Sequence, residues 1–234
     1  MVSKAFQKTP QKKSYDIVII GGAIMGSATS WFLSKNKNFG GSILVIERDP
    51  TYQFSSTART NSCIRQQFSR ELNIRISQYT AQFIKNFQEN LEDDRVPKLG
   101  IQNYGYMYLA DTKDKAKSLR TIQKTQLKAG ASTILMNPDE IKSKYPFYNV
   151  SDIFLGSINK VDEGYWDGGT VFDWLRRSSI DNGVEYISNE VTGINQNSNG
   201  NRVEEIVLKS GEVINCGVVV NAAGPRASKI SEML

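Results

Sequence analysis

The stretch IVIIGGAIMGSATSWFL, residues 17–33, passes from β-branched residues through two glycines into small and apolar ones. Residues 15–20 predict a short buried strand that Gly21 and Gly22 end, and residues 23–33 predict a helix. Residues 42–46 predict a second buried strand. Strand, glycine turn, helix and strand form one βαβ unit, so the sequence predicts an α/β fold.

The glycine turn matches most of the pattern that binds a dinucleotide. Such a turn uses one glycine for the tight turn, one for the approach of the pyrophosphate and one for packing the helix on the strand. Gly21 and Gly26 fill the first and third places, whereas Ala23 departs from the pattern at the second. The N–H groups at the start of the helix would supply the anion site. A plain glycine turn is the alternative for this pattern alone.

An acid at the end of the second strand favours the dinucleotide interpretation. Glu47 follows Gly21 by 26 residues, and the polar loop 36–41 explains the length beyond the usual offset of about 20. A carboxylate at this place accepts hydrogen bonds from ribose hydroxyls. An exposed charge that merely ends a strand is the alternative for Glu47 alone.

The rest of the chain predicts further helices and short strands. An amphipathic helix follows from the spacing of Leu72, Ile76, Tyr79, Phe83 and Phe87. Predicted helices cover residues 71–91, 114–129, 137–144 and 171–181; predicted strands cover 104–109, 153–158, 184–187, 191–194, 203–208, 213–215 and 218–220.

The composition excludes several classes of protein. No apolar run approaches the roughly 18 residues of a membrane span. Part of the net charge of +5 comes from lysines in the first 13 residues, and the charges are mixed elsewhere, so no nucleic-acid face is expected. The chain has no histidine, which excludes a Ser-His-Asp triad. Cys63 and Cys216 form no disulfide framework, so the cytoplasm is expected, with the mitochondrial matrix as the alternative.

Five motifs occur in order along the chain: DIVIIGGAIMGS, VIERDP, SSTARTNSCIRQQFS, EVTGI and VVNAAGP. Through them the sequence resembles the FAD-dependent oxidoreductases of the D-amino-acid oxidase superfamily, nearest to the branch of sarcosine oxidase and dimethylglycine dehydrogenase. The resemblance implies a Rossmann-like FAD-binding domain of the GR2 flavoprotein type over residues 15–95 and 165–234. It implies a partial mixed-sheet substrate domain over 96–164, and residues 1–14 are expected to form a basic flexible tail.

The resemblance also implies where FAD, bound without a covalent link, would contact the chain. The implied contacts lie in the glycine turn, after the second strand, in the following loop, and near the two final motifs. They are Gly21, Gly22, Ala23, Met25, Gly26, Glu47, Arg48, Ser56, Thr57, Arg59, Asn61, Val191, Ala222, Ala223 and Gly224.

The implied activity is oxidation of the C–N bond of a secondary or tertiary amino acid, such as sarcosine or dimethylglycine. Arg65 would bind the substrate carboxylate, because a guanidinium fork fits a carboxylate. Arg59 competes for that role, and an ordinary exposed arginine is the alternative for Arg65. No catalytic residue is assigned, and no metal is expected. Tyr104, Tyr106 and Tyr108 would share one face of a strand, for sheet packing or toward the flavin.

Family members continue beyond the VVNAAGP motif, so the resemblance implies a chain that is incomplete at its C-terminus. A split gene product, a fragment, or a half completed by another subunit would each explain this. A chain that carries the missing half is therefore an expected partner besides the small-molecule substrate. The alternative function is a module that binds FAD or a partner without catalysis.

Overall fold

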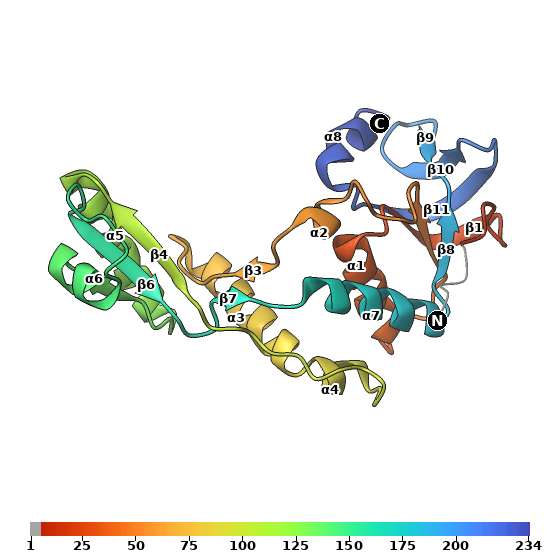
Figure 1. The fold of residues 1–234 in the computed structure, drawn as a ribbon. Coiled ribbons are helices and arrows are strands. Elements are labelled where there is room, and N and C mark those ends of the chain that lie inside the picture. Colours follow the sequence, from red (N-terminus) through yellow and green to blue (C-terminus); the bar gives the residue numbers. More distant parts are fainter. Residues whose placement is uncertain (1–5) are drawn as a thin grey trace. The chain divides into compact units, whose positions relative to one another are not determined.

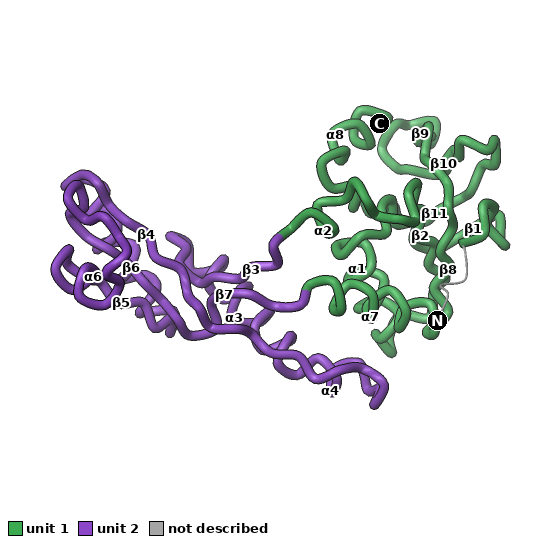
Figure 2. Tube along the Cα trace, viewed as in Figure 1, with its two compact units in different colours: residues 1–60, 168–234 green, residues 61–167 purple. Residues whose placement is uncertain are grey.

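The structure is a computed structural model that describes residues 6–234 in two compact units (Figures 1 and 2). Unit 1 extends to Thr60 and resumes at Gly168, and unit 2 comprises residues 61–167. Residues 61–95, which the sequence interpretation assigned to the FAD-binding domain, lie in unit 2, where Ile74 packs against Ala129 and Ala131. The boundaries of the functional domains stay a prediction.

Unit 1 contains a mixed sheet whose strands lie in the order β8-β2-β1-β11-β10-β9. The strands are β1 (Ser14–Ile20), β2 (Ile43–Glu47), β8 (Glu185–Ser188), β9 (Val191–Gln196), β10 (Val203–Leu208) and β11 (Val213–Asn221). Strands β8, β2, β1 and β11 are parallel, and β10 pairs with both of its neighbours in antiparallel fashion. The predicted α/β class is confirmed, and the parallel strands bring their carboxyl ends to one edge.

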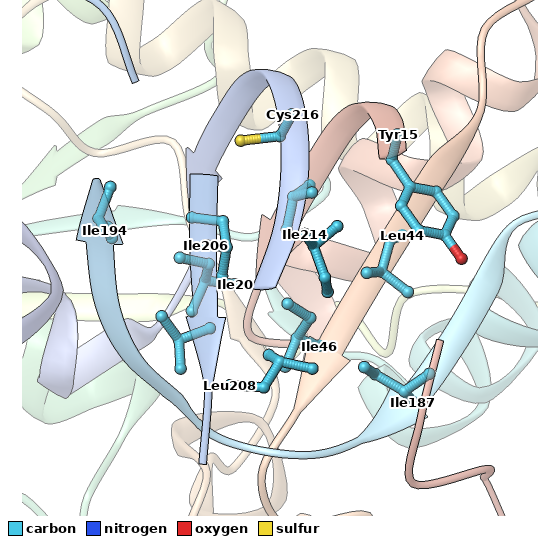
Figure 3. Packing of buried hydrophobic residues seen from close by; sticks show 12 residues of the cluster. Tyr15, Ile20, Leu44, Ile46, Ile187, Ile194, Ile206, Leu208, Ile214 and Cys216 are labelled. Atoms are coloured by element: carbon cyan, nitrogen blue, oxygen red, sulfur yellow. The ribbon is translucent and has the colours of Figure 1, made fainter. Parts of the chain in front are cut away.

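The sheet is buried on both faces along most of β1 and all of β2, which explains why these two strands are continuous apolar runs. On one face, Ile17 and Ile19 lie in a cluster with Leu33 of helix α1 (Ile24–Lys35), which packs beside α7 (Gly168–Asp181). On the other face, Ile20, Leu44, Ile46, Ile206 and Ile214 form the largest core cluster (Figure 3). The short helix α8 (Ala227–Ser231) adds Ile230 to this second face.

Strand β11 is longer than the sequence predicted. We expected two short strands over 213–215 and 218–220, but the structure has one strand that continues through Gly217. A Cβ at Gly217 would lie 2.8 Å from the carbonyl oxygen of Asp16. Glycine here therefore allows β11 to approach β1 closely rather than breaking the strand.

Part of the predicted N-terminal tail is bound to the sheet. Residues 1–5 lie outside the described residues. Gln7 forms a bridge with Ile187, and the N–H of Gln11 donates to Glu185. Residues 7–11 are therefore held beside β8.

Unit 2 contains a small antiparallel sheet of β4 (Tyr106–Ala110), β6 (Leu155–Asn159) and β5 (Ile134–Met136), in the order β4-β6-β5. A second pair joins β3 (Cys63–Ile64) to β7 (Gly164–Tyr165). The helices are α3 (Glu71–Lys85), α4 (Phe87–Leu91), α5 (Lys113–Lys128) and α6 (Pro138–Lys144). As predicted, Asn137 and Pro138 open α6, where Asn137 and Glu140 form a capping box.

The predicted helix 71–91 differs from the structure in two respects. It is divided at Asn86, which has φ −103° and ψ 25°. Its predicted buried stripe is also largely wrong, because Leu72, Ile76 and Tyr79 are 69%, 55% and 60% exposed. The buried side chains of α3 are Ile74, Ala81 and Ile84, which form a second set at helical spacing.

Candidate functional site

The glycine turn after β1 is fixed by close backbone packing. Gly21 has φ +101°, its N–H donates to the carbonyl of Ile46 at 2.9 Å, and a Cβ there would lie 2.5 Å from the carbonyl oxygen of Ala222. A Cβ at Gly26 would lie 1.9 Å from the carbonyl oxygen of Gly21. The two glycines thus allow the tight turn and the close contact of α1 with it, as a dinucleotide fold requires.

Glu47 lies beside this turn at the carboxyl end of β2. Its Oε2 accepts the N–H of Gly22 at 2.8 Å, and its Oε1 accepts the N–H of Asp49 at 2.8 Å. Each carboxylate oxygen can accept a further hydrogen bond. Glu47 therefore holds the turn in place, a role that the sequence interpretation missed, and retains the capacity to accept a hydroxyl.

The start of α1 has the properties of an anion site. Ala23 occupies the N-cap position without a side-chain cap, and the first turn contains no acid. The N–H of Ile24 donates to the hydroxyl of Thr57 at 3.2 Å, and Met25 is 68% exposed. Uncapped N–H groups and the helix dipole both favour a negative group here.

Helix α2 (Ser56–Arg59) brings a second segment toward the same end of the sheet (Figure 1). Thr57 links it to α1 through the hydrogen bond to Ile24, and Ser56 is exposed. Arg59 lies at the end of α2, where its Nε donates to the carbonyl of Gln53 at 3.2 Å and its guanidinium lies 5.2 Å from the Phe54 ring. Its neighbours hold Arg59 within unit 1.

The segment after β11 completes this edge of the sheet. The N–H of Ala222 donates to the carbonyl of Ile20 at 2.9 Å, and that of Ala223 donates to the Asn221 side chain at 3.3 Å. Gly224 has φ +57°, with no atom within 4 Å of the position of a Cβ. Residues 222–224 thus place small residues beside the glycine turn.

Two of the predicted contact residues lie apart from this group. Arg48 makes a long ion pair of 3.9 Å with Glu190. Val191 begins β9, its side chain is buried in the core, and it pairs with Leu208. Any contact of Val191 with a ligand would therefore involve its backbone, as the resemblance implied.

Asn61 and Arg65 belong to unit 2, where the predicted substrate residue is exposed. The carbonyl of Asn61 accepts the thiol of Cys63 at 3.5 Å. The guanidinium of Arg65 lies 5.0 Å from the centre of the Phe68 ring, a cation–π contact. The planar donors of Arg65 are thus supported by an aromatic ring and accessible to an anion.

A buried carboxylate that the sequence interpretation missed lies in the same unit. Glu163 is fully buried, and its Oε1 accepts the N–H of Gln66 at 2.6 Å and the side-chain amide of Asn159 at 3.0 Å. Its Oε2 accepts the side-chain amide of Gln67 at 3.0 Å. Burial raises the pKa of Glu163, whereas these donors and the charge of Arg65 oppose that rise.

The tyrosines of the predicted strand divide into two kinds. Tyr104 lies before β4 and is 71% exposed, because Gly105 with φ +81° turns the chain and the strand begins only at Tyr106. Burial raises the pKa of Tyr106 to about 12, and burial likewise raises the pKa of Tyr108. The positive charge of Arg65 partly opposes the rise in both pKa values, so Arg65 lies within electrostatic reach of this strand.

The residues at the edge of unit 1 fit the diphosphate and ribose of FAD. The uncapped start of α1 suits a diphosphate, the remaining acceptor capacity of Glu47 suits a hydroxyl, and the space at Gly224 suits a closely approaching ligand. Within residues 6–234, no group of histidine, cysteine, aspartate and glutamate side chains could hold a metal ion. No helix in that range is both long and apolar enough to cross a membrane.

Comparison with known proteins confirms the resemblance. The family described as FAD dependent oxidoreductase matches residues 16–234. FAD-dependent oxidoreductase domain-containing protein 1 of Xenopus laevis is 32% identical over 239 residues, covering 93% of this chain and 48% of that protein. The mitochondrial sarcosine dehydrogenase of Mus musculus is 26% identical over 228 residues, covering 96% and 24%. The crystal structure of L-proline dehydrogenase from P. horikoshii has a TM-score of 0.75 and 25% identity, covering 98% and 56%. The chain spans about half the length of the first curated relatives it matches.

Proposed function

The chain belongs to the FAD dependent oxidoreductase family, whose members depend on FAD, and we propose that the whole protein oxidises the C–N bond of a secondary or tertiary amino acid. The carbon next to the nitrogen would lose a hydride, and water would hydrolyse the resulting imine. Bound FAD supplies the hydride acceptor, so the protein contributes binding, orientation and electrostatics. The observation that carries the proposal is the gathering of the glycine turn, Glu47 and residues 222–224 at one edge of the sheet.

In this proposal the residues named from the resemblance hold the cofactor. The start of α1, with Gly21, Gly22, Ala23, Met25 and Gly26, would face the diphosphate. Glu47 would accept ribose hydroxyls, and Arg48 would lie by the adenine, next to the backbone of Val191. Ser56, Thr57, Arg59 and Asn61 would follow the chain toward the flavin, and Ala222, Ala223 and Gly224 would approach it from the neighbouring strand.

Arg65 would bind the substrate carboxylate in two parallel hydrogen bonds. Its exposed guanidinium, 5.0 Å from the centre of the Phe68 ring, supports that role, since a fork of donors recognises a carboxylate. The name of the mouse relative, a sarcosine dehydrogenase, supports an N-methyl amino acid as substrate. Its mitochondrial designation supports the matrix as the alternative to the cytoplasm.

Flavin reduction tests the proposal directly. The protein should be purified alone and together with a chain that supplies the second half of its relatives. The visible spectrum is then recorded anaerobically with sarcosine, dimethylglycine and L-proline. We expect the flavin absorbance to bleach with at least one of them. A protein that holds flavin but is bleached by no amino acid or N-methyl amine would exclude this substrate class.

A non-catalytic module that binds FAD or a partner is the second candidate. The chain spans about half the length of its first curated relatives, so turnover has to be measured both without and with a chain that supplies the remainder. Measuring turnover of the chain alone and of the co-expressed pair of chains separates the enzyme from the non-catalytic module. Turnover that requires the second chain supports a two-part enzyme, for which the name sarcosine oxidase subunit beta gives a precedent among the relatives. Turnover by the 234 residues alone would exclude the non-catalytic module.

We predict that FAD is bound without a covalent link to these residues. The chain has no histidine, and Cys63 and Cys216 match no attachment site of the resembled family. Acid precipitation of the yellow protein should leave the colour in the supernatant. Colour that remains in the pellet, with a flavin-bearing peptide after digestion, would contradict this prediction.

A further inference from the structure

We infer that Glu163 is the residue that positions Arg65 for the substrate carboxylate; this inference rests on the role proposed for Arg65. Glu163 is fully buried, and it bonds to the two residues that follow Arg65 in the chain. Its role would be to fix the segment that follows β3 and carries Arg65, and to provide a buried charge of opposite sign.

The hydrogen bond from Gln66 constrains the backbone of Arg65 itself. The N–H of Gln66 belongs to the peptide group that joins it to Arg65, so its 2.6 Å bond to Oε1 of Glu163 fixes the orientation of that peptide. The Gln66 side chain is buried and donates to the carbonyl of Val161 at 3.0 Å. With residue 66 held inward at two points, the exposed side chain of Arg65 leaves the backbone in a defined direction.

A second set of bonds ties the same segment to the three-stranded sheet. The amide of Gln67 donates to Oε2 of Glu163 at 3.0 Å and to the carbonyl of Tyr106 at 2.9 Å, and its Oε1 accepts the hydroxyl of Ser157 at 2.8 Å. Asn159 donates to the other carboxylate oxygen. The carboxylate thus joins the Arg65 segment to β6, and the Gln67 side chain joins it to β4.

A charge in this position requires a functional explanation beyond stability. Burial of a carboxylate is costly, and well-packed apolar side chains can replace buried ionic groups without loss of stability. Glu163 satisfies three donors and interacts electrostatically with Arg65, whose charge opposes the rise in its pKa. A negative charge that pins the adjacent backbone limits the orientations open to the long arginine side chain.

The matched control is Asp162→Asn, which removes the same charge from the neighbouring residue. Asp162 pairs with Lys85 at 2.9 Å, and its carboxylate bonds to none of the residues 65–67. Asparagine also tolerates the φ of +54° found at this position. Any effect of lost charge alone should therefore appear in both variants.

The experiment compares Glu163→Gln, Glu163→Asp and Asp162→Asn in the flavin-loaded protein. The probe is (methylthio)acetate, a carboxylate without an amine, titrated against the flavin absorbance. We expect Glu163→Gln to weaken its binding roughly 10- to 100-fold, most of what loss of the charge-assisted pair with Arg65 would cost. The affinity of Glu163→Asp for the probe should lie between those of Glu163→Gln and wild type. The affinity of Asp162→Asn should stay within about twofold of wild type.

Steady-state kinetics with the amino acid that reduces the flavin should show the same difference between Glu163→Gln and Asp162→Asn. Glu163→Gln should raise KM for the carboxylated substrate about as much as it weakens the probe, with kcat changed by less than about threefold. Equal losses in Glu163→Gln and Asp162→Asn, or a lower kcat with unchanged KM, would overturn the inference. If Glu163→Gln does not fold, the inference is tested by Glu163→Asp, which should bind (methylthio)acetate more weakly than Asp162→Asn does.

The outcomes separate this inference from the proposed function. If no amine bleaches the wild-type flavin while the probe still distinguishes Glu163→Gln from Asp162→Asn, the proposed reaction is wrong and the positioning role stands. If substrate bleaches the flavin but the two variants bind the probe alike, the positioning role is wrong and the reaction stands. If wild type and Arg65→Met bind the probe equally, Arg65 is not the carboxylate site and the inference is overturned.

Discussion

Gly26→Ala is expected to yield protein that holds no flavin and unfolds at a clearly lower temperature. The new methyl group would lie 1.9 Å from the carbonyl oxygen of Gly21, far inside any real Cβ contact. Both atoms are on or next to the main chain, so no side-chain rotation can relieve the overlap. Helix α1 would have to move away from the turn by about 1 Å, and overpacking of this kind typically costs about 1–3 kcal/mol or more.

The loss of flavin should exceed what lower stability alone produces, because the displaced helix start is the proposed diphosphate site. Gly40→Ala is the matched control, since it makes the same change in the same unit, at an exposed glycine with no atom within 4 Å of a Cβ. Circular dichroism measures the midpoint of thermal unfolding, which should fall by roughly 5–10 °C for Gly26→Ala and stay unchanged for Gly40→Ala. A Gly26→Ala protein that is yellow and as stable as the control would show that α1 does not pack as described.

The fold of unit 1 could be predicted because its signals are local. The apolar runs of β1 and β2, the glycines between them and the acid after β2 each follow from the residue order alone. The elements that the sequence missed, such as β3 and β7, are two residues long and depend on pairing with residues distant in the sequence. No local pattern specifies a strand of that length.

The amphipathic helix α3 shows where residue patterns mislead. Leu72, Ile76 and Tyr79 are large and largely apolar, yet Ile74, Ala81 and Ile84 are the buried residues. The first set is spaced by four and three residues and the second by seven and three, which are both helical spacings, so periodicity alone cannot choose between the faces. The choice depends on the partners of the helix, which are distant in the sequence.

The candidate site also contains residues whose place could be predicted from the sequence and one residue whose place could not. The proximity of Gly21, Gly26 and Glu47 at one edge of the sheet was predictable, because they occur at a characteristic spacing; their contact with FAD stays a prediction. Glu163 was not predictable, because an acid in a polar turn normally lies in solvent. Its burial results from donors 97 and 96 residues away in the sequence, on Gln66 and Gln67.

Arg65→Met should weaken substrate binding and leave flavin binding unchanged, whereas Arg59→Met should weaken flavin binding. The two arginines lie six residues apart in the sequence but belong to different compact units. Arg59 ends α2, whose Thr57 is bonded to the start of α1, so its charge belongs with the proposed diphosphate site. Arg65 is exposed in unit 2, near Phe68 and within electrostatic reach of Tyr106 and Tyr108.

The size of the effect follows from the loss of a charge-assisted pair. Such a pair contributes about 1.5–3 kcal/mol, so Arg65→Met should raise the apparent substrate constant roughly 10- to 150-fold. Methionine keeps an unbranched apolar stem like that of arginine, so the substitution removes the guanidinium with little change to the rest of the side chain. Flavin content per chain and the substrate constant should both be measured for Arg65→Met and Arg59→Met. A colourless Arg65→Met, beside a yellow Arg59→Met that has lost only substrate affinity, would reverse the two roles and assign the carboxylate to the end of α2.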